Sequence, residues 1–290
     1  MEKLLVLDVG GSSIKCGVWE NEKLVELKSR RTPDTWEGMK NTFLDIQKEA
    51  GNNLQGVAIS IPGSVNVDEG VIYGTSAIPY IHRFPIKKEL SKLFGLKVTL
   101  QNDANCAALA EVWRGNAADV TNSAFLIIGS GIGGAVVLNK QLIPGSHLFG
   151  GEFGYMIINR DTGGTLSELG SPVTMANEFT NKRNDQKVYE GKDVFELAQQ
   201  KDPQALNSVI SLYDALSVGI FNLAVSFDPD KVLIGGGISR RPDLLSELQK
   251  RFKKISREKH ADGLDTKIES CKFLSEANMI GTVYQFELEK

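Results

Sequence analysis

Several short segments of this chain combine residue types that bind phosphate or move a proton. In the segment 8–15, DVGGSSIK, Gly10 and Gly11 let the backbone come within hydrogen-bonding distance of phosphate oxygens, and Ser12 adds a donor without bulk. The carboxylate of Asp8 could hold a hydrated Mg2+ beside such phosphates. A plain hairpin turn with an acidic neighbour is the alternative, so this segment alone predicts little.

The run 129–134, GSGIGG, predicts a second phosphate-facing hairpin through Ser130 and Gly131. It is not a Walker loop, because no GKS or GKT follows, and it is not a dinucleotide fingerprint, because a strand follows it rather than a helix. A glycine-rich junction of buried strands is the alternative. Two hairpins of this kind could clamp a triphosphate between two lobes.

A candidate general base lies in the run 101–105, QNDAN. Asp103 follows a buried strand, and Asn102 could orient an alcohol while the carboxylate takes its proton. A helix N-cap is the alternative, for which Asp and Asn are favoured in any case. The two roles do not exclude one another.

Two further glycine-rich segments could contact a sugar and a nucleotide. Glu152 and Tyr155, in the run GGEFGY, could hydrogen-bond sugar hydroxyls, or they belong to an ordinary loop. The residues Gly235, Gly236 and Gly237 follow a buried strand and permit the close approach of a flat ring such as adenine. A lone triglycine is more often a turn.

Apolar periodicity predicts strands and helices around these segments in a three-layer α/β pattern. We expect strands over 4–8, 14–19, 24–27, 54–61, 96–100, 123–128, 135–138, 232–234 and 267–273. We expect helices over 36–50, 86–94, 104–113, 171–181, 193–200, 203–227, 242–255 and 276–288. A strand, a glycine turn and a second strand occur twice, roughly 120 residues apart, which suggests two related halves.

The composition is that of a folded globular chain of 290 residues, with 41% hydrophobic and 24% charged residues. Its 33 Lys and Arg against 36 Asp and Glu give a net charge of -3, which argues against nucleic acid as a partner. Three scattered cysteines offer neither a disulfide framework nor a metal knuckle. The first apolar run, 4–7, is too short for a signal peptide, so we expect a cytoplasmic protein with no membrane partner.

Taken together, the segments resemble the ROK family of repressors, open reading frames and kinases, in the actin-like sugar-kinase superfamily. The run from Ile128 through 142–145, LIPG, to Gly154 is similar to the long signature of that family. The segments 8–15 and 102–105 also resemble segments of that family, independently of this run. The resemblance covers essentially the whole chain. It implies a two-lobed actin-like ATPase (ribonuclease H-like) fold with duplicated mixed-sheet domains. The small domain would be 1–112 plus 276–290 and the large domain 113–275.

The resemblance also implies an ATP-dependent kinase that phosphorylates the 6-hydroxyl of a hexose, with Mg2+ neutralising the phosphates. Asp103 would be the catalytic base, and the sugar would contact Gly63, Asn102, Glu152, Tyr155 and Glu168. The ATP phosphates and adenine would contact Gly10, Gly11, Ser12, Ser130, Gly131 and Gly235–Gly237, with Asp8 holding Mg2+ through water. A homodimer through the larger lobe is expected from the family alone.

Two departures from the family pattern bear on zinc and on the substrate. Many members have a histidine where this chain has Tyr155, followed by a zinc-binding cysteine cluster, but 160–170 contains no cysteine, so we expect no structural zinc. The second sugar glutamate of the family falls at Ser167 in an ungapped alignment, with Glu168 one residue along. Either a one-residue shift restores that role to Glu168 or the pocket differs. Both changes concern the anomeric end of the sugar and leave room for a C1 substituent, as in a β-glucoside such as cellobiose, or for an altered C2 group such as an N-acetyl. Zinc-less members with Tyr at this place resemble β-glucoside kinases, which favours the β-glucoside.

The alternatives among kinases are a glucokinase or fructokinase and an N-acetylmannosamine kinase. Outside catalysis, a repressor would need a helix-turn-helix ahead of the core, whereas the first strand begins at Leu4, and a non-catalytic sugar sensor would not need Asp103. His82, His147 and His260 are far apart in sequence, and we expect surface or loop positions for all three.

Overall fold

The computed structural model describes residues 3–290, and the chain divides into two compact units. Unit 1 comprises the chain through Gly115 together with Gly145–Phe149 and Ser275–Lys290. Unit 2 comprises Asn116–Pro144 and Gly150–Leu274. Each unit has its own mixed sheet and its own hydrophobic core.

The sheet of unit 1 has the strand order β3-β2-β1-β5-β8. Its strands are β1 (Leu4–Val9), β2 (Ser13–Glu20), β3 (Lys23–Glu26), β5 (Gly56–Ile61) and β8 (Lys97–Asn102), and the short β4 (Arg30–Arg31) pairs with β2. The first three strands form an antiparallel meander, and β5 and β8 continue the sheet in parallel with β1. Every residue of β1 and β5 is buried, as expected for central strands covered on both faces.

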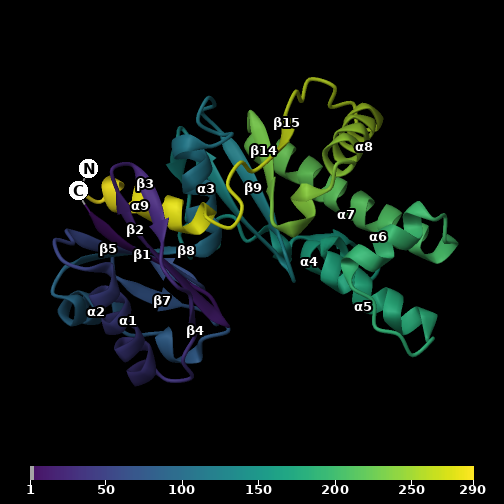
Figure 1. The fold of residues 1–290 in the computed structure, drawn as a ribbon. Helices are drawn as coiled ribbons and strands as arrows, with labels where there is room; N and C mark the ends of the chain where they lie inside the picture. Colours follow the sequence, from purple (N-terminus) through teal and green to yellow (C-terminus); the bar gives the residue numbers. More distant parts are fainter. Residues whose placement is uncertain (1–2) are drawn as a thin grey trace. The chain divides into compact units, whose positions relative to one another are not determined.

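Helices pack on this sheet (Figure 1). The helices α1 (Trp36–Ala50) and α2 (Ile86–Phe94) pack on one face, and α9 (Ala277–Leu288) packs on β1, β5 and β8 beside α3 (Asp103–Arg114). The Thr35 side chain caps α1 by accepting from the Gly38 N–H, and Met39, Phe43 and Ile46 then bury one helical face.

The sheet of unit 2 repeats this topology with the order β11-β10-β9-β14-β15. Its strands are β9 (Ser123–Ile128), β10 (Ile132–Leu138), β11 (Gln141–Leu142), β14 (Lys231–Gly235) and β15 (Lys267–Ser270). The first three are antiparallel, and β14 and β15 are parallel to β9, as β5 and β8 are to β1. The predicted α/β fold with two related mixed sheets is therefore confirmed.

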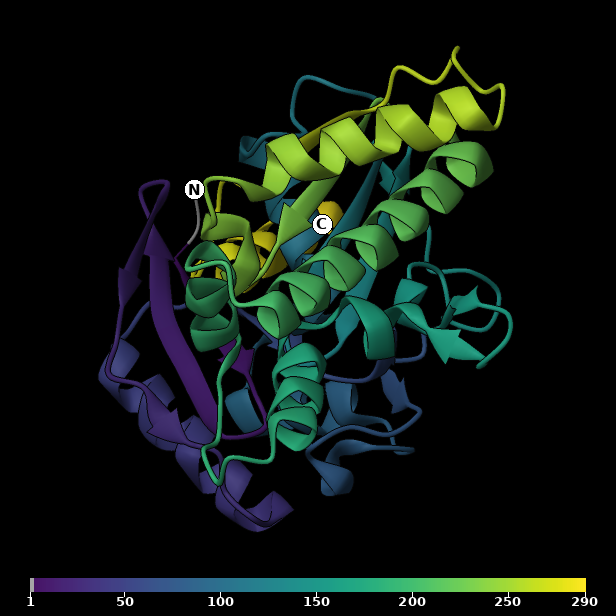
Figure 2. The same cartoon turned by 90° about the vertical axis from the view of Figure 1, so that its right-hand side faces the viewer.

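The helices of unit 2 are α4 (Leu166–Gly170), α5 (Pro172–Arg183), α6 (Gly191–Gln199), α7 (Pro203–Phe227) and α8 (Leu244–Glu258). The long α7 and α8 lie side by side over the sheet (Figure 2). By length and composition alone α7 would be long and apolar enough to cross a membrane, but half of its most apolar window is buried within the unit. That burial is what a core helix requires.

The structure differs from the sequence expectations mainly in short elements. Two small hairpins were not expected: β6 (Ser64–Asn66) with β7 (Val71–Tyr73), and β12 (Ile157–Asn159) with β13 (Gly164–Thr165). Short 3-10 helices occupy η1 (Pro79–Ile81), η2 (Phe153–Tyr155) and η3 (Gly237–Arg240). The strand expected over 267–273 ends at Ser270, although the Cys271 N–H still donates to the Ile234 carbonyl of β14 at 2.9 Å.

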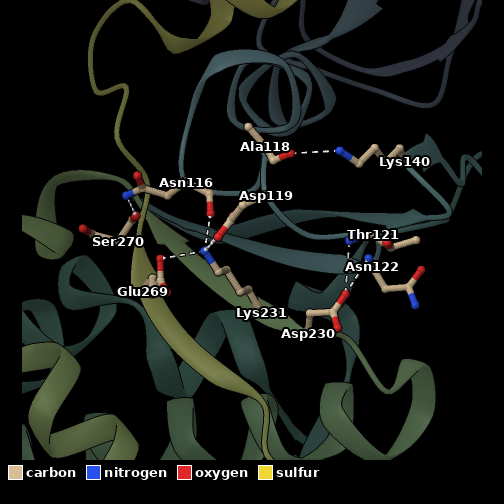
Figure 3. Close-up of polar contacts among 10 residues, drawn as sticks. All are labelled: Asn116, Ala118, Asp119, Thr121, Asn122, Lys140, Asp230, Lys231, Glu269 and Ser270. Atoms are coloured by element: carbon tan, nitrogen blue, oxygen red, sulfur yellow. Dashed lines mark hydrogen bonds and ion pairs between the residues drawn. The ribbon is translucent and has the colours of Figure 1, made fainter.

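A cluster of polar residues links the segment 116–122 to the unit 2 sheet where β14 begins (Figure 3). Lys231, at the start of β14, donates to Asp119 at 2.9 Å and to the Asn116 carbonyl at 2.8 Å, and it lies 3.2 Å from Glu269 on β15. Asp230 accepts from the N–H groups of Thr121 and Asn122. The cluster ties the segment 116–122 to the neighbouring strands.

Candidate functional site

The carboxyl ends of β1, β5 and β8 bring the expected unit 1 residues into adjacent positions. Asp8 is paired with Ser60 across β1 and β5, and Ser60 with Gln101 across β5 and β8. Asn102 and Asp103 follow directly where β8 ends and α3 begins. Ligands of open parallel sheets bind at such carboxyl ends, because the loops there leave room above the strands.

Asp103 is the first residue of α3, and Asn102 is its N-cap. The Asn102 side chain accepts from the Asn105 N–H at 3.1 Å, and Gln101 in turn accepts from the Asn102 N–H at 2.8 Å. Burial raises the pKa of Asp103, the Ala104 N–H opposes that shift, and the charge of Asp8 adds to it. A carboxylate with a raised pKa accepts a proton more readily near neutral pH, which suits a general base.

Asp8 is a buried carboxylate with partners on three elements. One oxygen accepts from Ser60 on β5 and from Asn278 on α9, each at 3.0 Å, and the other lies 3.6 Å from the Lys15 ammonium. Both oxygens are thus already held by protein donors, so Asp8 fits a hydrated cation held through water better than one bound directly. Lys15 lies opposite Asp8 across the β1–β2 hairpin, and sequence reasoning assigned it no role.

The turn between β1 and β2 holds the first glycine pair in a fixed hairpin. Gly10 donates to the Ser13 carbonyl at 2.9 Å, and the Thr32 hydroxyl donates to the Gly10 carbonyl at 2.6 Å. Gly11 and Ser12 are exposed at the tip. A side chain on Gly11 would meet Ala77, since an added Cβ would lie 2.7 Å from the Ala77 Cβ. The hairpin is therefore braced from behind and open at its tip.

Gly63 connects its loop to Asn102. Its φ of +105° requires glycine, and its carbonyl accepts from the Asn102 side-chain amide at 3.0 Å. His82 lies on the other side, where a Cβ on Gly63 would approach its Cε1 to 3.0 Å. His82 lies in a loop, as expected, and its Nε2 is hydrogen-bonded to Ser76 at 2.8 Å while its Nδ1 is buried.

In unit 2 the turn between β9 and β10 forms the second hairpin. Gly129 donates to the Gly131 carbonyl at 2.9 Å, and the Ser171 hydroxyl lies within hydrogen-bonding distance of the carbonyls of Gly129 and Ser130. Gly129 and Ser130 are exposed, and a Cβ on Gly129 would meet no atom within 4 Å. This hairpin is also held from behind and open at its tip.

The triglycine lies against the end of β9. Gly236 has a φ of +86°, and a Cβ there would lie 1.9 Å from the Ile128 carbonyl oxygen. Gly235 ends β14, and Gly237 begins η3 with open space around its Cα. Glycine at 236 therefore lets the chain turn directly beside the residue that precedes the hairpin.

The sequence profile described as the ROK family matches residues 4–287. The chain belongs to the ROK family. It is 32% identical to a β-glucoside kinase of Klebsiella pneumoniae, over 98% of this chain and 96% of that protein. A ROK family protein from Streptococcus pneumoniae TIGR4, solved in complex with sucrose, superimposes with a TM-score of 0.90 at 30% identity, over 99% of this chain and 98% of that one.

The fold is also that of a ROK glucokinase from Streptomyces griseus solved with glucose and AMPPNP, with a TM-score of 0.78 at 24% identity over 97% of both chains. The β-glucoside kinase relative assigns this ROK protein to the carbohydrate kinases.

Glu152 is the N-cap residue of η2, and Tyr155 is the last residue of η2 and is 70% exposed. The glycine between them is needed for close packing, because a Cβ on Gly154 would lie 2.2 Å from the Ile132 carbonyl oxygen and 2.3 Å from the Ser167 Oγ. The Ser167 hydroxyl in turn accepts from the Ile132 N–H at 2.9 Å. Ser167, at the ungapped position of the second sugar glutamate of the ROK family, is thus fixed against the start of β10.

Glu168 forms a capping box at the start of α4. Its carboxylate accepts from the Thr165 N–H at 2.8 Å and from the Thr165 hydroxyl at 2.9 Å, and these bonds lower its pKa. It borders a cavity of about 630 Å³ between α5 and α7, which none of the other expected site residues lines. A sugar-binding role for Glu168 stays a prediction, and its carboxylate already has a structural one.

Within residues 3–290, no three His, Cys, Asp or Glu side chains gather into a group that could hold a metal ion.

Proposed function

We propose that this protein transfers the γ-phosphoryl group of ATP to the 6-hydroxyl of the glucose unit of a β-glucoside such as cellobiose. The observation that carries the proposal is the setting of Asp103, a partly buried carboxylate with a raised pKa at the carboxyl end of the unit 1 sheet. Asp103 takes the proton of the 6-hydroxyl as the oxygen attacks the γ-phosphorus, and the bond to the bridging oxygen of ADP breaks.

The sugar contacts in this proposal come from Gly63, Asn102, Glu152, Tyr155 and Glu168. The roles of Gly63 and Asn102 are supported by the hydrogen bond between them, because it holds the Gly63 loop against an amide that directly precedes Asp103 in the chain. Glu152 and Tyr155 supply a carboxylate and an exposed aromatic ring, the side chains that sugar hydroxyls and sugar faces bind.

The nucleotide contacts are the two open hairpins and the triglycine. Gly10, Gly11 and Ser12 in unit 1, and Ser130 and Gly131 in unit 2, offer backbone and hydroxyl donors to the phosphates. Gly235–Gly237 border the adenine. Mg2+, bound to the phosphates and held by Asp8 through water, would neutralise their charge.

The preference for a β-glucoside is supported by the residues at the anomeric end. Ser167 is shorter than a glutamate, and its hydroxyl accepts a hydrogen bond from the Ile132 N–H. It therefore leaves room where a longer side chain would reach the sugar. The exposed Tyr155 ring can stack on the aglycone sugar. The Klebsiella pneumoniae relative is named for the same substrate class.

A homodimer and a cytoplasmic location complete the proposal. The exposed apolar side chains of α7, Leu206, Ile210 and Val225, support an interface on unit 2. Cys16, Cys106 and Cys271 are buried and form no disulfide, as is usual in a reducing compartment.

The test is ATP-dependent ADP release with cellobiose, methyl β-glucoside, glucose, fructose, mannose and N-acetylmannosamine at equal concentrations. We expect the highest kcat/KM with cellobiose, and no ADP release above background with 6-deoxyglucose, which lacks the acceptor oxygen. A preference for a free monosaccharide would assign the protein to the kinase of that sugar. Sugar binding without any ADP release would identify a sensor instead.

A further inference from the structure

The segment 74–82 of unit 1 contacts both of the loops that the proposed function needs. Near its middle, Ala77 packs on Gly11 in the phosphate hairpin, since a Cβ on Gly11 would lie 2.7 Å from the Ala77 Cβ. At its end, His82 packs on Gly63, whose added Cβ would lie 3.0 Å from the imidazole Cε1. One short segment therefore spans the distance between the expected phosphate and sugar contacts.

A hydrogen bond between Ser76 Oγ and His82 Nε2, 2.8 Å long, closes this segment on itself. Ser76 Oγ also accepts from the Ile78 N–H at 3.2 Å and donates to the Ile78 carbonyl at 3.5 Å. In either tautomer of the imidazole, Ser76 is the hydrogen-bond partner of His82 Nε2. Nδ1 is buried without a hydrogen-bond partner in the described residues, so this bond is what fixes the ring.

The fixed ring is linked to the expected base through two residues. His82 supports Gly63 at its back, and the Gly63 carbonyl accepts from the Asn102 side-chain amide at 3.0 Å. Asn102 caps the helix in which Asp103 is the first residue. A shift of the Gly63 loop would therefore move the amide that lies directly beside Asp103.

We propose that His82 is a positioning residue for phosphoryl transfer, and that its bond to Ser76 holds the Gly63 loop, and through it Asn102, in the geometry that the reaction needs. The inference rests on the proposed function, because it assigns His82 a part in the reaction of Asp103. It concerns alignment and not chemistry, since the imidazole acts through Gly63.

Two substitutions of the same histidine test this assignment. His82→Gln keeps an amide N–H near the place of Nε2, whereas His82→Asn keeps one near the place of Nδ1 and loses the bond to Ser76. We expect His82→Asn to lower kcat by about 10-fold or more, since small misplacements of reacting groups carry large rate costs. His82→Gln should restore most of that loss. Ser76→Ala should match His82→Asn, and combining them should add little, because both remove one bond.

The same variants are compared by hydrogen exchange, which needs no activity. His82→Asn should raise exchange in peptides covering both 9–14 and 62–66, while His260→Asn, at an exposed histidine, should change neither exchange nor kcat. A wild-type rate in His82→Asn, or exchange raised only within 74–82, would overturn the assignment. If the wild type phosphorylates no sugar, the proposed function fails, and exchange at the two loops still decides whether His82 holds them.

Discussion

At the scale of single residues, the site relies on side chains that perform a structural and a chemical task together. Asn102 caps α3 with its side-chain oxygen and holds the Gly63 loop with its side-chain nitrogen. Asp103 begins the same helix, and burial of its carboxylate raises its pKa toward the range of a useful base. The start of α3 therefore fixes the position of both groups in the chain.

Gly236 and Gly237 are neighbours in the chain, but only Gly236 is closely packed, so alanine should have different effects on stability at the two positions. Gly236→Ala should lower the free energy of unfolding by about 3 kcal/mol or more, since its φ is +86° and the new Cβ would overlap the Ile128 carbonyl. Gly237→Ala meets no atom within 4 Å and should change stability by less than about 1 kcal/mol. Chemical denaturation of both variants checks this. Equal stability of the two would mean that the triglycine is not packed as described.

At the scale of elements, the sequence predicted what has strong local patterning and missed what depends on contacts. The bounds of α2 and α7 agree with the predicted ranges 86–94 and 203–227, because apolar spacing and a Pro or Gly at an end define both. The β6–β7 hairpin was missed because strands of three residues carry too little alternation. The contacts of His82 were not predicted, because its partners, Ser76 and Gly63, form no sequence motif with it.

Lys231 provides a prediction at the scale of elements, since its ammonium joins the segment 116–122 to β14 and β15 (Figure 3). Lys231→Met should lower the free energy of unfolding by about 2 kcal/mol, as expected for lost hydrogen bonds to charged groups. Lys267→Met is the matched control, because Lys267 is the exposed β15 residue paired with Lys231. Thermal unfolding compares them, and an equal loss in both would contradict a special role for the cluster.

At the scale of the whole molecule, the protein has a duplicated fold and an exposed apolar face on α7. The two sheets share one strand order and one pattern of parallel and antiparallel pairing, so the two glycine hairpins occupy equivalent places in their sheets. The sequence indicated this through its repeated strand, glycine turn and strand. It did not indicate which part of α7 stays exposed, because that depends on how α5, α6 and α8 pack around it.

The exposed face of α7 leads to a prediction about assembly. If it forms the interface of the proposed homodimer, Ile210→Glu should convert the dimer to a monomer, because a buried unpaired charge is costly at an interface. Light scattering after size exclusion measures the mass. Val25→Glu, at an exposed apolar residue of unit 1, should leave the mass unchanged. A wild-type monomer, or an Ile210→Glu dimer, would contradict the proposed interface.

The most direct test of the central claim compares Asp103→Asn with the wild type in ATP-dependent phosphorylation of cellobiose, with sugar binding measured by calorimetry. We predict that kcat falls about 100-fold or more, because the proton of the 6-hydroxyl loses its acceptor, while the Kd for the sugar changes little. Asp262→Asn, at an exposed aspartate, should keep the wild-type rate. An Asp103→Asn variant that retains most of its rate would show that another group is the base, and would contradict the account.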